Sequence, residues 1–222
     1  MRTMRLLLRS TGELFITVGL VLLLFCVYQL VWTNVEAQRN QDAVGDRITR
    51  EWKVPAPVAA PEPPLVKGEG FAFIRIPRLG KKFNVPIVEG VRARDLSRGV
   101  GHYPRTVRPG EVGNFAVAGH RATNGEPFRN LDRLRRGDAV VIETGTEWLT
   151  YVVDRTRIVT PRDVWVLDPV PGKPGATPTK PLLTLTTCNP RWASTERLIV
   201  FGHLEDASPK SAGRPAALAG RS

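Results

Sequence analysis

A run of 19 residues without one charged side chain, Leu14–Trp32, constrains this chain more than any other feature. A helix that spans a bilayer needs about 20 apolar residues. The run is apolar on all faces, which is not the pattern of an amphipathic globular helix. Three arginines precede it, so the positive-inside rule places residues 1–13 in the cytoplasm and the rest of the chain outside. The sequence therefore predicts a single-pass protein of the cell membrane, anchored through residues 14–32.

The alternative to an anchor is a cleaved signal peptide. Val35, Glu36 and Ala37 form a tolerable small-x-small cleavage site. The apolar core, however, is longer than the roughly 7–15 residues that such a signal uses. An uncleaved anchor is therefore the preferred interpretation, and the signal peptide remains the alternative.

Changes in composition divide the rest of the chain into three parts. Residues 33–69 begin polar and contain the proline-rich segment 55–64, which favours extended polyproline II and predicts an extracellular spacer. Residues 70–206 hold the alternating apolar segments of one globular domain. Residues 207–222 are rich in Ala, Gly, Ser, Pro and Arg, and we expect a disordered tail there.

The globular part has the pattern of short strands separated by turn residues, which is typical of a closed barrel or a sandwich. The fold class is therefore all-β. One short helix is expected near Pro127–Arg135, where Phe128, Leu131 and Leu134 recur at helical spacing. The expected strands are Phe71–Ile76, Asn84–Glu89, Asn114–Gly119, Asp138–Glu143, Trp148–Asp154, Arg157–Thr160, Leu182–Thr187 and Arg197–Leu204.

The charge and the cysteine count exclude several classes of function. The net charge is +11, but the basic residues are spread along the chain and form no stripe with interleaved aromatics, so we expect no nucleic-acid partner. Two cysteines and three histidines are too few for a zinc ribbon or an iron–sulfur cluster. No acidic cluster resembles a calcium site. The sequence therefore predicts no metal and no cofactor.

Cys188 is the first candidate for chemistry. It follows the apolar strand 182–187, and Asn189-Pro190 then turns the chain, so we expect its side chain at the rim of the barrel. A lone cysteine is more often a small buried hydrophobe, but hydroxyl residues and a turn flank this one. The other cysteine, Cys26, lies in the membrane run. Cys188 is thus expected to be a free thiol in an oxidising compartment, a state that favours catalysis.

Two cationic or titratable neighbours could act with this thiol. Arg197 begins the next strand, and a tight return of the chain would place it beside Cys188, where it could donate to an oxyanion. Its alternative role is a salt bridge to Glu196. His120 closes an earlier strand and is a candidate acid and base, although a histidine at a strand end is often only structural.

The combination of these residues resembles the sortases, cysteine transpeptidases of Gram-positive bacteria. The matching motif is Thr184–Cys188 with Arg197 nine residues after the cysteine and His120 well before it. The turn Gly101–Pro104 and the Asn-Pro pair after Cys188 are most similar to class E sortases of actinobacteria. The resemblance implies an eight-stranded β-barrel over residues 70–206, with one or two short helices.

The resemblance also implies an activity. Sortases cleave a sorting signal of the LPXTG or LAXTG type between Thr and Gly. Cys188 would attack the Thr carbonyl, His120 would protonate the leaving glycine, and Arg197 would hold the oxyanion. The thioester would then pass to an amine of a peptidoglycan precursor. The implied partners are surface proteins that carry the signal, and that amine.

Tyr103 and Thr187 are the substrate-side candidates. From class E relatives, a tyrosine in the Gly-His-Tyr-Pro turn is expected to contact the sorting signal. Its alternative role is to cover the barrel rim. Thr187 is expected to order the site beside Cys188.

Two other functions stay open: a cysteine hydrolase of cell-wall peptides and a non-catalytic wall-binding β-barrel. Papain-like hydrolases place the cysteine before the histidine, whereas His120 precedes Cys188 here. A hydrolase-like side activity is compatible with either enzyme.

Overall fold

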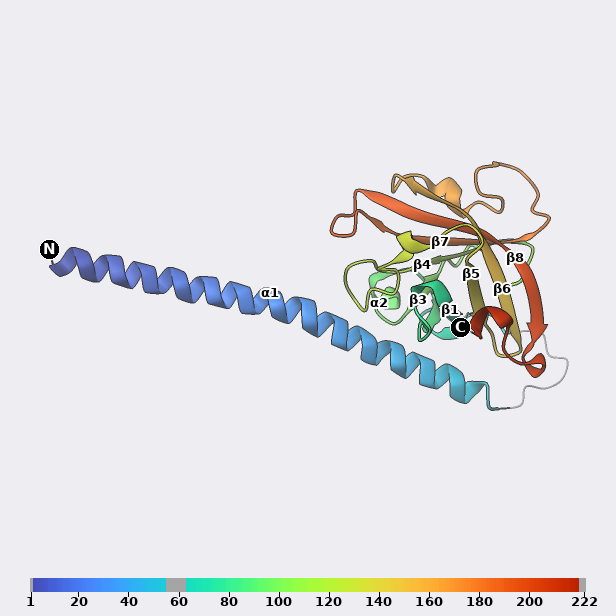
Figure 1. Cartoon of the computed structure of the whole chain (residues 1–222), viewed down its shortest axis with the longest axis horizontal. Coiled ribbons are helices and arrows are strands. Elements are labelled where there is room, and N and C mark those ends of the chain that lie inside the picture. The colour runs from blue at the N-terminus through green and yellow to red at the C-terminus, as the bar shows by residue number, and fades with distance from the viewer. Residues whose placement is uncertain (1, 55–62, 220–222) are drawn as a thin grey trace.

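The computed structural model describes residues 2–54 and 63–219, and it combines one long helix with a β-barrel (Figure 1). Helix α1 (Arg2–Glu51) carries the apolar run and projects well beyond the barrel. Its segment Arg9–Glu51 is long and apolar enough to cross a membrane, and no part of its most apolar stretch is buried against the protein. The proline-rich segment expected at 55–64 lies, for residues 55–62, outside the described residues.

Within the described residues, eight strands close a barrel in the order β1-β2-β3-β4-β7-β8-β6-β5, which confirms the all-β barrel. The strands are β1 (Gly70–Arg75), β2 (Val85–Glu89), β3 (Val100–His102), β4 (Gly113–Ala118), β5 (Ala139–Glu143), β6 (Glu147–Val159), β7 (Pro181–Asn189) and β8 (Glu196–Pro209). The short helical elements are α2 (Ala93–Leu96), η1 (Pro77–Leu79), η2 (Leu131–Arg133), η3 (Val164–Leu167), η4 (Lys210–Ala212) and η5 (Ala216–Leu218).

The parallel strands β4 and β7 pair side by side in the barrel wall. The two strands run in register from the Gly113–Pro181 pair to the Ala118–Thr186 pair. Their inward side chains, among them Phe115 and Leu185, are fully buried in the main core. Each such side chain contributes about 1.5–3 kcal/mol through burial. Because the strands are parallel, the residues that follow them emerge at the same rim of the barrel.

Three local expectations differ from the structure. The three-residue strand β3 lies where a turn was expected, because a strand this short shows no alternation in the sequence. The two segments 148–154 and 157–160 are one continuous strand, β6. The helix expected at 127–135 is only the single 3-10 turn η2, although Phe128, Leu131 and Leu134 are buried as the spacing required.

Helix α1 continues through the first half of the expected spacer, which was predicted to begin at residue 33. The continuation packs against the barrel: Val44 and Ile48 form a small core with Phe73 and Val88. Gly70 makes the close approach possible, because a Cβ there would lie 2.4 Å from a Val44 methyl carbon. The apolar contact, which pairs residues distant in the sequence, stabilises helix in a segment that the sequence assigned to the spacer.

The tail expected to be disordered from Ala207 is ordered through residue 219. Strand β8 pairs with β6 as far as Pro209, opposite Glu147. The amine of Lys210 then lies 2.9 Å from the Glu143 carboxylate and 4.0 Å from the centre of the Trp52 ring. These contacts with the barrel and with the end of α1 explain the order, and the expected disorder was wrong for this segment.

Candidate active site

The antiparallel hairpin of β7 and β8 carries the candidate nucleophile and the candidate oxyanion donor. Cys188 pairs directly with Arg197 across the hairpin. Side chains of directly opposed residues lie on the same face, with their Cβ atoms about 5 Å apart. Cys188 is a half-buried free thiol. The structure therefore brings these two residues together at one rim.

The guanidinium of Arg197 is held by backbone carbonyls. Its Nη1 donates to Ser194 O at 3.0 Å and to Glu196 O at 2.8 Å. The Glu196 carboxylate accepts instead from Asn189 Nδ2 at 2.6 Å. Guanidinium carries five N–H donors, and these two bonds involve only one of its nitrogens. The side chain is thus oriented by the β7–β8 connection (residues 190–195) and keeps other donors for a ligand.

His120 stands two residues beyond the end of β4, at the same rim as Cys188. The intervening Gly119 donates its N–H to Thr186 O at 3.1 Å, and the hydroxyl of Thr187 donates to Gly119 O at 2.8 Å. Gly119 must lack a side chain, because a Cβ there would lie 2.6 Å from the Phe128 ring. These bonds tie the residue before His120 to the residue before Cys188.

Burial sets the ionisation of His120. The imidazole is partly removed from water, and this desolvation lowers its pKa below the usual value. The Nδ2 of Asn124 lies 3.5 Å from His120 Nε2. The lowered pKa favours the neutral imidazole, the form that can accept a proton.

A tight turn after His120 is joined to the β7–β8 connection through one carboxylate. Asn124 and Glu126 have positive φ angles of 52° and 45°, with Gly125 between them at 78°. The Glu126 carboxylate accepts from Arg191 Nη2 at 3.0 Å and lies 3.4 Å from Arg129 Nε. Left-handed residues other than glycine persist where their surroundings hold them, and this carboxylate supplies that restraint.

Arg121 makes a second connection between the two loops. Its side chain is buried, and its Nη1 donates to Cys188 O at 3.3 Å and also to Asn189 Oδ1. Its Nη2 lies 3.3 Å from Asp132 Oδ1. The residue after His120 is thereby bonded to the backbone of Cys188. Sequence analysis assigned no site role to Arg121, Glu126 or Arg191, although Arg121 directly follows His120.

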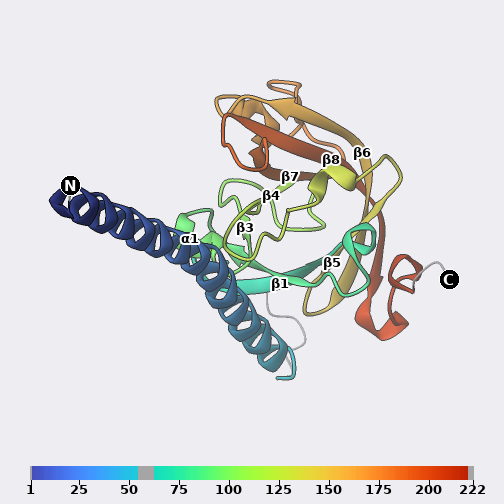
Figure 2. The ribbon, with the colours of Figure 1, turned by 60° about the vertical axis from the view of Figure 1, so that its left-hand side comes forward.

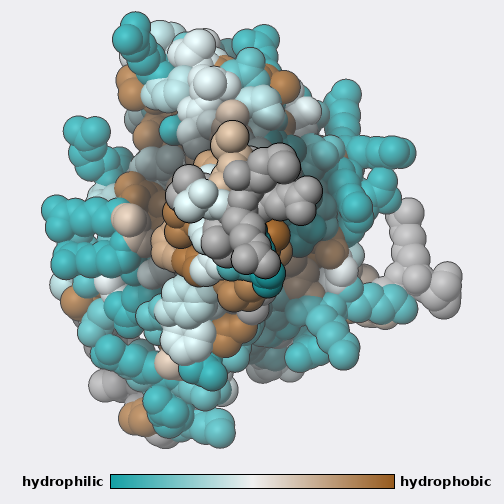
Figure 3. Space-filling view, turned by 90° about the vertical axis from the view of Figure 1, so that its left-hand side faces the viewer, coloured by the Kyte–Doolittle hydropathy of each residue, from teal (hydrophilic) through white to brown (hydrophobic). Residues whose placement is uncertain are grey.

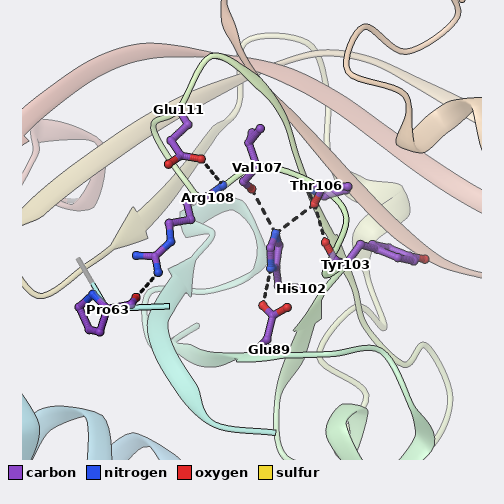
Figure 4. A network of polar contacts seen from close by, with 9 residues as sticks. Pro63, Glu89, His102, Tyr103, Thr106, Val107, Arg108 and Glu111 are labelled. Atoms are coloured by element: carbon purple, nitrogen blue, oxygen red, sulfur yellow. Dashed lines mark hydrogen bonds and ion pairs between the residues drawn. The ribbon is translucent and has the colours of Figure 1, made fainter. Parts of the chain in front are cut away.

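Tyr103 reaches the site from the end of β3, which β4 separates from β7. Its hydroxyl lies 3.0 Å from Thr186 Oγ1, so it stands next to the end of β7. The preceding residue, His102, is the last of β3 and was wrongly expected in a turn. In Figure 4 the Tyr103 ring extends away from the buried contacts of His102.

Those contacts make His102 structural. Its Nδ1 lies 2.6 Å from the Glu89 carboxylate and its Nε2 lies 3.1 Å from Val107 O, which places the ring in the interior (Figure 4). Thr106 Oγ1, which lies 3.0 Å from Nε2, donates to the Tyr103 carbonyl at 2.8 Å. His102 and Thr106 together thus support the turn that carries Tyr103. Among the described residues, no three His, Cys, Asp or Glu side chains gather as a metal site.

Comparison with known proteins gives consistent matches. A model of the Sortase domain matches residues 74–205. Sortase SrtE1 of Streptomyces coelicolor is 41% identical over 95% of this chain, and the chain spans only 60% of the length of that protein. Sortase SrtE2 of the same organism is 34% identical over 87% of this chain and 80% of its own length.

Solved structures show the same fold. Sortase E from Streptomyces avermitilis is 49% identical with a TM-score of 0.64, covering 69% of this chain and 99% of that one. Sortase E1 from Streptomyces coelicolor, solved with a tripeptide in its active site, is 41% identical with a TM-score of 0.64 and the same coverage. The domain match covers more than half of the chain and coincides with the closed barrel. The chain therefore belongs to the sortase family and is similar to its class E members.

Proposed function

We propose that this protein is a membrane-anchored cysteine transpeptidase. It cleaves a sorting signal of the LPXTG or LAXTG type between Thr and Gly and transfers the acyl group to an amine of a peptidoglycan precursor. The observation that carries the proposal is the pairing of Cys188 with Arg197 on one hairpin, at the rim where the strand before His120 ends. Membership of the sortase family supports the reaction class.

In the first half of the reaction, Cys188 Sγ attacks the carbonyl carbon of the signal threonine. The imidazole of His120, which its lowered pKa keeps available in the neutral form, takes the thiol proton. The bond from the carbonyl carbon to the glycine nitrogen then breaks. The leaving glycine amine receives the proton from His120, and a thioester remains on Cys188.

The negative charge that develops on the carbonyl oxygen requires nearby donors. Arg197 lies directly across the hairpin from Cys188, and its remaining N–H groups supply them. The hydroxyl of Tyr103 lies 3.0 Å from Thr186 Oγ1, in a position to contact the signal peptide. Thr187 acts through Gly119, whose carbonyl it holds next to His120.

In the second half, an amine attacks the thioester carbon. The carbon–sulfur bond breaks, the amine proton passes to His120, and His120 returns a proton to the Cys188 thiolate. A thioester divides one difficult amide exchange into two easier steps.

The apolar part of α1 fits an anchor with residues 1–13 in the cytoplasm and the barrel outside, where surface proteins and wall precursors meet.

Mass spectrometry of the full chain mixed with LPXTG and LAXTG peptides tests the proposal. A mass increase on Cys188 equal to the peptide without its glycine end is expected, and it should be absent in Cys188→Ala. Added amine should convert the adduct to a new amide. A cysteine hydrolase would release free acid at the same rate with or without amine. A non-catalytic barrel would leave Cys188→Ala equal to the native chain, which would refute the proposal.

A further inference from the structure

The position of the barrel relative to a bilayer follows from where the apolar run of α1 ends. The run closes at Trp32, and its 19 residues span about 28 Å as helix, close to the roughly 30 Å of the hydrocarbon core. Two residues further on, Asn34 is about 3 Å beyond that core along the helix axis. If α1 spans the membrane as proposed above, Asn34 lies in the headgroup layer.

Asn34 contacts the turn that follows His120. Its side-chain oxygen accepts from the Gly125 N–H at 3.0 Å, and its amide nitrogen donates to Glu126 Oε1 at 3.4 Å. One and two helical turns further on, Ala37 and Gln41 are only 2% and 6% exposed, and both approach Gly125. The turn after His120 is therefore held at the depth of the headgroups by the helix itself.

The contacts continue from this turn to the β7–β8 connection. Glu126 accepts from Arg191 at 3.0 Å, and the guanidinium of Arg191 lies 5.2 Å from the centre of the Trp192 ring. Trp192 is 71% exposed, which is unusual for so large an apolar side chain. The connection that carries Trp192 thus lies beside the end of the apolar run.

The figures show the same arrangement. In Figure 1 the turn that joins β7 to β8 reaches back toward the N-terminal half of α1, farther than the core of the barrel does. Figure 2, turned by 60°, keeps that turn on the side of the N-terminus. Figure 3 views the molecule from this side and shows long hydrophilic side chains around the periphery with hydrophobic patches between them.

We propose that the tip of the β7–β8 connection, residues 191–193, lies in the headgroup layer of the bilayer that holds α1, with Trp192 as its interfacial anchor. Tryptophan favours this layer, because its ring is apolar and its N–H finds polar partners there. Cys188 and Arg197 flank the connection. The site would therefore lie close to the membrane surface, where it would meet signal peptides that are still close to the bilayer. The inference rests on the anchoring proposed for α1.

Photocrosslinking in the full chain tests this contact. The chain with Trp192→p-benzoylphenylalanine is reconstituted in vesicles of phosphatidylglycerol and phosphatidylcholine and irradiated, and lipid adducts are counted by mass spectrometry. The matched control is Val112→p-benzoylphenylalanine, because Val112 is 53% exposed and precedes β4 at the end opposite His120. Interfacial contact should give about tenfold more lipid adduct at 192 than at 112.

Equal lipid adducts at both positions, or a crosslink at 192 to an added LAXTG peptide in place of lipid, would overturn the inference. A second measurement needs no photoprobe: brominated lipids should quench the fluorescence of the native chain more than that of Trp192→Phe, and equal quenching counts against the contact. Flotation with the vesicles and thioester formation at Cys188 are measured in the same samples. A chain that floats and forms thioester but gives equal adducts refutes only the headgroup contact, whereas a chain that does not float refutes the anchor as well.

Discussion

At the residue scale, one hydroxyl links the two strands that deliver the candidate acid and nucleophile. Thr187 is 3% exposed and donates to Gly119 O, next to His120, while its own backbone leads into Cys188. Most other contacts between the two loops come from charged side chains. This neutral bond can be removed with little change of volume, which makes it a sensitive probe of how tightly the site must be held.

Thr187→Val should lower kcat about tenfold, because the buried Gly119 carbonyl loses a donor at a cost of about 1–3 kcal/mol and His120 is held less firmly. Steady-state transfer of a fluorescent LAXTG peptide measures the effect, with circular dichroism to check the fold. Thr146→Val, on the exposed β5–β6 turn, is the control and should not change kcat. An equal rate in Thr187→Val and the native chain would show that the bond does not matter to the reaction.

Arg197→Lys should reduce kcat about 100-fold or more, because a planar fork of donors is replaced by a single ammonium that cannot reproduce its geometry. KM should change much less if the donors act on the oxyanion rather than on the bound peptide. Arg157→Lys, on the adjoining strand β6, is the matched exposed control. A native kcat in Arg197→Lys would exclude Arg197 from the oxyanion role.

At the element scale, the rim that carries the candidate site consists of two loops that are joined by several side-chain contacts. The turn 124–126 has three successive residues at positive φ. Its only glycine is in the middle, so the flanking Asn124 and Glu126 carry strain of about 1–3 kcal/mol each. The ion pair of Glu126 with Arg191 and the hydrogen bond to Asn34 offset that strain. The element is thus shaped by partners that come from α1 and from the β7–β8 connection.

Glu126→Gln tests this coupling, because it keeps the shape of the side chain and removes its charge. The ion pairs with Arg191 and Arg129 are lost, so we expect kcat to fall about three- to tenfold and the pH profile to shift as the surroundings of His120 change. Glu147→Gln, at the exposed start of β6, serves as the matched control. Unchanged kcat and an unchanged pH profile would mean that the turn keeps its shape without the carboxylate.

At the scale of the whole molecule, burial of His120 connects the site to the stability of the barrel. Its pKa is lowered in the folded chain by desolvation, whereas the unfolded chain has the ordinary value of about 6.5. Below about pH 6.5 the unfolded chain therefore binds a proton that the folded chain does not. The contribution of His120 to the free energy of unfolding is present above that pH and is lost as the pH falls toward the folded pKa.

Acidification from pH 8 to pH 5 should therefore lower the Tm of the native chain more than that of His120→Gln. Thermal unfolding of both chains, solubilised in the same detergent, measures the difference, and the values at pH 8 provide the baseline where the histidine is neutral in both states. Parallel curves for the two chains over this range would show that His120 keeps an ordinary pKa in the fold.

Local patterns were sufficient for much of this molecule. The uncharged run that ends at Trp32, the alternation in strands such as Asn114–Gly119, and the cysteine that ends a strand nine residues before Arg197 all depend on neighbours in sequence. Periodicity and spacing express such relations directly, which is why an all-β domain and its candidate residues could be predicted. The choice of a barrel over a sandwich came from the resemblance to the sortases.

Only the tertiary structure decided the features that join distant segments. Strand β3 forms because β2 and β4 flank it, α1 continues because Val44 and Ile48 find Phe73, and residues 207–219 are ordered by contacts such as that of Lys210 with Glu143. The contact of Glu126 with Arg191 spans 65 positions in the chain. The sequence by itself determined which segments are apolar and which residues can do chemistry. Which segments meet was decided by burial and pairing between surfaces that exist only once the barrel has closed.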